Sequence, residues 1–139
     1  AVFITHQGYL KRIPLDTLQK MHMAKTGALF LAAIRSGAIL GNATDEQLQA
    51  LSVYAEKFGL AFQITDDILD VTGTTEQIGK PAGSDERNHK STYVTLTSLA
   101  EAQQLARTTA DEAKASLQGF GPEADFLREL VEYLVTRDK

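Results

Sequence analysis

The chain has 139 residues, 43% of them hydrophobic and 23% charged, and a formal net charge of −4 at pH 7. Nucleic-acid binding needs a net basic surface that displaces counterions, so an acidic chain is a poor match for it. The absence of cysteine excludes a disulfide framework and thiolate chemistry. No apolar run reaches the roughly 18–20 residues that a membrane span requires, and we expect a cytoplasmic protein.

The first half of the chain predicts two long helices. Residues 1–13 carry no helix start signal, and we expect a loop there. A helix is predicted over residues 15–40, ended by a glycine–asparagine pair. Thr44 and Gln47 form a capping-box pattern, so a second helix should begin there and continue to about residue 71.

The second half predicts a polar loop followed by shorter helices. Apolar spacing stops at a glycine, resumes after residue 91, and nowhere alternates with a period of two. We therefore predict an all-α protein, an antiparallel helix bundle. The segments expected are a short turn at 76–78, a loop at 79–88, and helices near 92–97, 101–117 and 125–136.

Three carboxylates, Asp66, Asp67 and Asp70, end the second predicted helix. Asp66 continues an apolar stripe spaced by three and four residues, so we expect it on a buried face, where a carboxylate needs a cation. The three carboxylates can converge on a hard cation such as Mg2+. The alternative is a solvated acidic face, but apolar residues flank the run instead of lysine and arginine. The stripe consists of Leu48, Leu51, Ala55, Phe58 and Phe62.

Lys25 lies on the apolar face of the first predicted helix, next to Thr26. A lysine at a core position needs an anionic partner, and the two side chains together offer a charge and a hydroxyl group to phosphate. Small residues such as Gly27 and Ala28 permit close approach of a helix or of ligand oxygens. The alternative is that Lys25 reaches back to water and Thr26 only packs.

The polar loop and its end contribute Lys80, Asp85 and Lys90. Taken alone, such lysines are solvated charges. Gly79 with Lys80 lacks the spacing of a phosphate-binding Walker motif, and the histidines have no zinc-ligand spacing. These loop residues therefore indicate a binding site only when they are considered together with the acidic run and Lys25.

Taken together and in this order, these motifs resemble the trans-isoprenyl diphosphate synthases, most closely the bacterial farnesyl and geranylgeranyl diphosphate synthases. The resemblance covers the chain from about Pro14 to its end. It rests on residues 22–27 (HMAKTG), 62–70 (FQITDDILD), 79–80 (GK), 83–85 (GSD) and 90–93 (KSTY).

The resemblance implies an all-helical, Mg2+-dependent prenyltransferase that condenses an allylic diphosphate with isopentenyl diphosphate. In this family two aspartate-rich motifs face each other and bind a diphosphate through Mg2+, and this chain supplies the second motif. By position, Asp66 would ligate a metal directly. Asp67 and Asp70 would act through water or from a second layer, and Asp85 would assist the same ion.

The resemblance also assigns residues to the substrate. Lys25, Lys80 and Lys90 would contact the allylic diphosphate, while Thr26 and Gln63 would help to place the substrate or the departing group. The catalytic set implied is therefore Lys25, Asp66, Lys80 and Lys90.

The family's first aspartate-rich motif and its upstream arginine pair do not occur in these residues. We therefore expect residues 1–139 to be the C-terminal portion of one all-helical domain, either a piece of a longer enzyme or one chain of a split enzyme, and inactive alone. The family is usually homodimeric. The positions that set product length lie upstream of the first motif.

Two other functions stay open. A class I terpene cyclase would ionise a prenyl diphosphate without adding isopentenyl diphosphate, although the three lysines favour the synthase. A catalytically silent helical subunit that needs a partner chain is the other alternative, although the intact acidic run argues against it.

Overall fold

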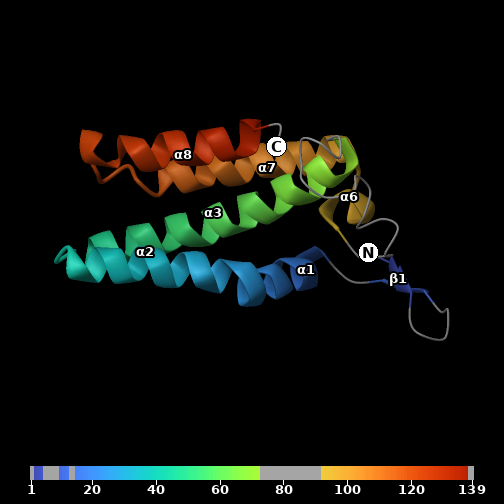
Figure 1. Cartoon of the computed structure of the whole chain (residues 1–139), viewed down its shortest axis with the longest axis horizontal. Coiled ribbons are helices and arrows are strands. Elements are labelled where there is room, and N and C mark those ends of the chain that lie inside the picture. The colour runs from blue at the N-terminus through green and yellow to red at the C-terminus, as the bar shows by residue number, and fades with distance from the viewer. Residues whose placement is uncertain (1, 5–9, 13–14, 73–91, 138–139) are drawn as a thin grey trace.

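The computed structural model describes residues 2–4, 10–12, 15–72 and 92–137, and most of them are helical (Figure 1). The predicted all-α helix bundle is confirmed. Its helices are α1 (Leu15–His22), a π-helical segment η1 (Met23–Gly27), α2 (Ala28–Leu40), α3 (Asp45–Thr72), α6 (Tyr93–Leu96), α7 (Leu99–Ala115), a 3-10 turn η2 (Pro122–Ala124) and α8 (Asp125–Thr136).

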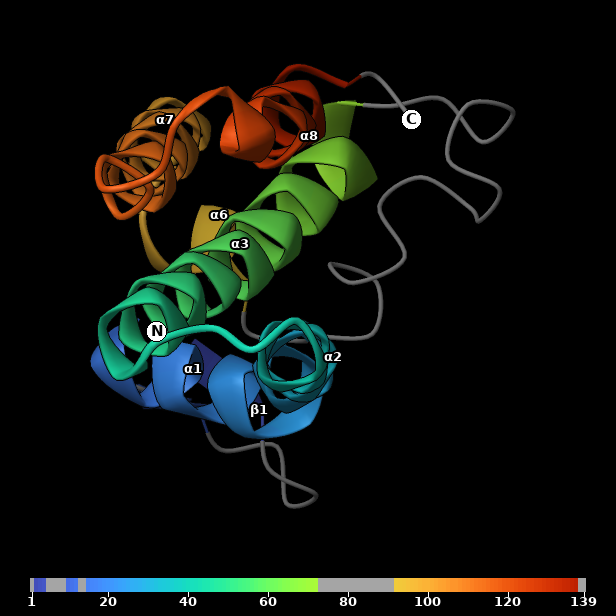
Figure 2. The ribbon, with the colours of Figure 1, turned by 90° about the vertical axis from the view of Figure 1, so that its left-hand side faces the viewer.

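Helix α3 runs through the middle of the bundle, between two layers (Figure 2). The continuous run of α1, η1 and α2 lies on one side, and α7 and α8 lie on the other. Arg35 of α2 donates a 2.8 Å hydrogen bond to the Ser52 hydroxyl of α3, which joins the first layer to the centre. None of the described helices is long and apolar enough to cross a bilayer.

Local signals placed most helix ends correctly. The capping box at the start of α3 is confirmed, since Thr44 N–H donates to Gln47 and Gln47 N–H donates to Thr44, at 2.9 and 3.2 Å. Helix α7 begins two residues earlier than expected, because the Ser98 hydroxyl accepts the Glu101 N–H and caps it. The helix predicted over residues 15–40 is continuous but contains the π-helical turn η1.

Two short strands, β1 (Val2–Ile4) and β2 (Leu10–Arg12), pair as an antiparallel hairpin at a place where we expected a loop. Val2 lies opposite Arg12, and Ile4 lies opposite Leu10. Branched and aromatic residues favour extended backbone, but three-residue strands are too short to display a period of two. The hairpin is an addition to the helical bundle.

The core consists of two clusters, and α3 contributes to both. One lies where α3 meets α1, α6 and α7, around Leu18, Ile64 and Tyr93. The other lies where α3 meets α7 and α8, around Tyr54 and Val131. The hydroxyl of Tyr54 donates a 2.8 Å hydrogen bond to the Leu127 carbonyl oxygen, so α3 is tied to α8 inside this second cluster.

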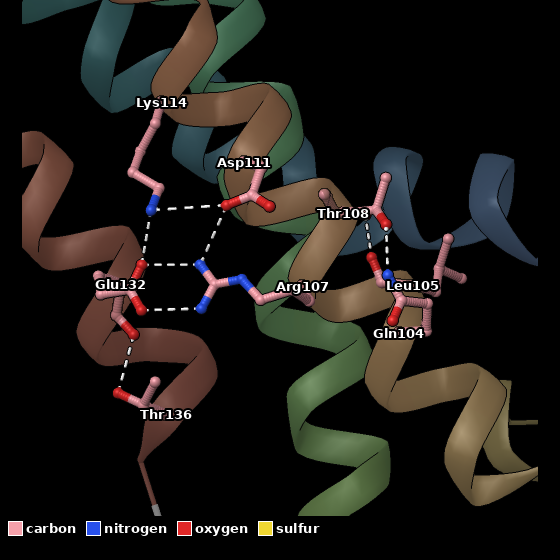
Figure 3. A network of polar contacts seen from close by, with 9 residues as sticks. Gln104, Leu105, Arg107, Thr108, Asp111, Lys114, Glu132 and Thr136 are labelled. Carbon is pink, nitrogen blue, oxygen red and sulfur yellow. Dashed lines mark hydrogen bonds and ion pairs between the residues drawn. The ribbon is translucent and has the colours of Figure 1, made fainter.

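An ion-pair network joins α7 to α8 (Figure 3). The guanidinium of Arg107 donates to both carboxylate oxygens of Glu132, at 2.8 and 2.7 Å, and Lys114 donates to the same carboxylate at 2.6 Å. Asp111 lies within 3.2 Å of Arg107 and extends the network along α7. The hydrogen bonds from Arg107, then those from Lys114, lower the pKa of Glu132 to about 2.

We expect Glu132 to make folding pH-dependent. Its pKa lies below the ordinary value of 4.5, so its stabilising effect is complete above pH 4.5 and is lost as the pH falls towards 2. Because the carboxylate is 42% exposed, solvent screening keeps the effect modest. The melting temperature of Glu132→Gln should lie below that of the wild type at pH 7 and match it near pH 2.

The control for this measurement is Glu129→Gln, which removes the same charge from an exposed position on the same helix. A Glu132→Gln difference that stays constant from pH 7 to 2 would show that the network does not stabilise the fold through its charges.

Candidate functional site

The acidic run lies in the last turns of α3, where its three carboxylates meet different surroundings. Asp67 and Asp70 are buried, at 4% and 3% exposure, whereas Asp66 is only half buried. We expected Asp66 on the buried face. The difference arises because α3 is covered from two sides, and the stripe that leads to Asp66 is not its most deeply covered face.

The stripe before Asp66 forms an aromatic cluster with α2. The ring of Phe30 lies 5.1 Å from that of Phe58 and 5.5 Å from that of Phe62, measured between centroids. The guanidinium of Arg137, which follows α8, lies 5.2 Å from the centroid of the Phe62 ring. Phe62 lies one helical turn before Asp66, and no local sequence signal pointed to Arg137.

Asp67 accepts hydrogen bonds from two described groups. Its Oδ2 accepts the backbone N–H of Tyr93 at 2.9 Å, and its Oδ1 accepts the side-chain amide of Gln63 at 3.3 Å. Burial, and second the charge of Asp67, raise the pKa of the Tyr93 hydroxyl well above its ordinary value. Gln63, expected beside the substrate, here binds the neighbouring carboxylate.

Lys25 and Thr26 lie in η1, the π-helical turn between α1 and α2. Such turns are uncommon and occur frequently at functional sites. This segment packs closely on α3, since a Cβ added at Gly59 would lie 3.1 Å from the Cα of Gly27. The expected close approach at the small residue Gly27 is therefore present, with Gly59 as its counterpart.

The place where η1 packs on α3 and the acidic run lie on the same helix, so their separation along its axis can be stated. Asp66 lies seven residues after Gly59, a rise of about 10 Å along the helix axis. The turn that carries Lys25 and the start of the acidic run thus lie on neighbouring elements, about two helical turns apart.

The remaining predicted residues, Lys80, Asp85 and Lys90, lie outside the described residues. Within the described part, no three His, Asp or Glu side chains lie close enough together to hold a metal ion. The acidic run therefore supplies oxygen donors of the kind that Mg2+ prefers, without forming a closed site by itself.

Comparison with known proteins places the chain in a family. The family model described as "Polyprenyl synthetase" matches residues 5–133. The chain belongs to the polyprenyl synthetase family. The resemblance drawn from the motifs is thereby confirmed.

Individual members of the polyprenyl synthetase family agree with this. The farnesyl diphosphate synthase of Micrococcus luteus is 44% identical over 133 residues, which are 96% of this chain and 46% of that protein. A polyprenyl synthase structure from Caulobacter crescentus CB15, complexed with calcium and isoprenyl diphosphate, has a TM-score of 0.87 at 28% identity, over 92% of this chain and 51% of that one.

A second structure of a similar protein is the geranyltransferase of Helicobacter pylori complexed with magnesium and isoprenyl diphosphate. Its TM-score is 0.73 at 31% identity, and the match covers 90% of this chain and 41% of that one. The chain spans 34–46% of the length of the curated polyprenyl synthetases that it matches.

Proposed function

We propose that this chain is the part of a short-chain prenyltransferase that carries the second aspartate-rich motif. The complete enzyme condenses an allylic diphosphate with isopentenyl diphosphate to make farnesyl or geranylgeranyl diphosphate. The observation that carries the proposal is the packing of the Lys25 turn on α3, two helical turns before Asp66. The identity to a farnesyl diphosphate synthase supports the same reaction.

Asp66 would hold Mg2+ directly, Asp67 and Asp70 would act through water or from a second layer, and Asp85 would assist the same ion. Mg2+ keeps several waters and takes one or two carboxylates plus phosphate oxygens, which suits carboxylates one turn apart on a helix. Its contribution is to stabilise negative charge on the departing diphosphate. The magnesium in the Helicobacter pylori structure supports this choice of ion.

The lysines and the apolar side chains of the site have separate tasks: the lysines bind the diphosphate, and the apolar side chains exclude water. Lys25, Lys80 and Lys90 bind the allylic diphosphate, with Thr26 and Gln63 nearby, and stabilise it more strongly as its charge grows. The allylic carbon–oxygen bond breaks, and its electron pair leaves with the diphosphate. The double bond of isopentenyl diphosphate then attacks the allyl cation, and a proton is lost to the diphosphate. Apolar walls keep water from the cation.

Helix α2 exposes large apolar side chains, as expected of a surface that packs against the rest of the enzyme. No residue of α2 is buried, and Leu29 and Leu40 are 72% and 84% exposed. Large exposed apolar side chains gathered on one helix are typical of an interface. We assign it to the remaining half of the same enzyme, because the matched relatives are more than twice as long as this chain. A homodimer of complete enzymes and a cytoplasmic location remain predictions.

A product assay tests the proposal. The complete enzyme, incubated with geranyl diphosphate and Mg2+, should form a longer prenyl diphosphate only when isopentenyl diphosphate is present. The chain alone should form none. Product formation from the allylic diphosphate alone would identify a terpene cyclase, and no turnover by the complete enzyme would indicate a silent subunit.

A further inference from the structure

Asp67 differs from its neighbour Asp66 in what surrounds it. Successive helical residues are rotated by about 100°, so the two carboxylates leave α3 in different directions. Asp66 follows the half-buried face of Phe62, whereas Asp67 is 4% exposed and turns towards α6. The two carboxylates of one motif therefore need not share one task.

The start of α6 explains why a carboxylate is needed there. The first N–H groups of a helix have no partner within it. Two of these N–H groups are satisfied by a reciprocal pair of side chains. The Thr95 N–H donates to the Thr92 hydroxyl at 3.2 Å, and the Thr92 N–H donates to the Thr95 hydroxyl at 2.8 Å. The N–H of Tyr93 lies between these two and is accepted by Asp67 at 2.9 Å.

This contact is strong and long-range in the sequence. Tyr93 is fully buried, and a hydrogen bond to a charged acceptor in such a place is stronger than one between neutral groups. It joins two elements that are 26 residues apart along the chain. The residue Lys90, which lies outside the described part, comes two positions before Thr92 in the sequence.

We infer that Asp67 is a positioning residue: its carboxylate fixes the start of α6 on α3 and so fixes the point from which the segment carrying Lys90 leaves. It supports diphosphate binding through that segment and is not itself a metal ligand. The inference deepens the proposed function and rests on it for its kinetic consequence. The anchoring contact itself stands on the hydrogen bond from the Tyr93 N–H to Asp67.

Two substitutions in the complete enzyme separate anchoring from metal binding. Asp67→Asn keeps an acceptor for the Tyr93 N–H but removes the charge that a metal needs. It should retain slow amide exchange at Tyr93, measured by NMR, and an unchanged Mg2+ concentration for half-maximal rate. Asp67→Ala should speed that exchange by about tenfold or more. It should also raise the KM for geranyl diphosphate more than it lowers kcat.

A matched pair of variants supplies the controls. Thr95→Val removes the capping hydroxyl at the same helix end without touching α3, and a rise in KM like that of Asp67→Ala would support positioning. Asp66→Asn is the metal-side comparison and should shift the Mg2+ dependence. If Asp67→Ala does not fold, Asp67→Asn and Thr95→Val still decide the question.

The inference is overturned if Asp67→Asn shifts the Mg2+ dependence as far as Asp66→Asn does, or if Tyr93 exchange is unchanged in Asp67→Ala. If the wild-type enzyme lacks prenyltransferase activity, the proposed function fails, whereas the exchange experiment still tests the anchor. The two failures are therefore distinguishable.

Discussion

Replacing Asp66 with alanine should lower the turnover of the complete enzyme by about 100-fold or more while the fold survives. An ion that stabilises the departing diphosphate contributes several kcal/mol to the transition state, and about 1.4 kcal/mol corresponds to each factor of ten. Asp66 is half buried, so the truncation removes little packing. Steady-state kinetics over a range of Mg2+ concentrations, together with thermal melting, measures both effects.

The control for Asp66→Ala is Glu56→Ala, which removes an exposed carboxylate from the same helix. It should leave turnover within about twofold, since surface substitutions are usually near neutral. Unchanged turnover in Asp66→Ala would remove Asp66 from the mechanism. A loss of turnover that merely follows a loss of folded protein would assign it a structural role.

The second large effect is expected at Gly59. A Cβ there would lie 3.1 Å from the Gly27 Cα and 3.3 Å from the Phe30 ring, so valine must push η1 away from α3. Overpacking of this kind costs about 1–3 kcal/mol, which urea denaturation of the 139-residue chain would measure. In the complete enzyme the displaced Lys25 turn should lower kcat/KM by about tenfold to 100-fold.

The matched control for Gly59→Val is Gly37→Ala on α2. A Cβ at Gly37 meets nothing within 4 Å, so this change should stabilise the chain by about 0.5–1 kcal/mol through helix propensity. Equal effects at the two glycines would mean that the close approach of η1 and α3 does not matter for stability.

Features governed by neighbouring residues were predictable from the sequence. The capping box of Thr44 and Gln47 and the bounds of α8 depend on contacts within a few residues, and both are as predicted. The family was recognisable because its motifs are short, contiguous stretches. The roles of the lysine and aspartate residues in those motifs stay predictions.

Features set by long-range packing were not predictable in this way. Whether Asp66 or Asp67 is the more buried depends on how α6 and α7 cover α3, and a periodic stripe on one helix carries no information about that. The Arg137–Phe62 contact and the Asp67–Tyr93 hydrogen bond each join distant segments. The π-helical turn likewise reflects how α1 and α2 must both fit α3.

The π-helical turn changes the rotational phase between α1 and α2, which together form one continuous helix. A wider turn takes up about one residue more than an α-helical turn, which rotates α1 relative to α2 by about 100°. Leu18 before it and Phe30 after it can therefore both reach α3. Deleting a single residue within Met23–Gly27 would therefore leave an ordinary α-helix with Leu18 and Phe30 still facing α3, whereas forcing all five residues into α-helical geometry would rotate Leu18 away from the core.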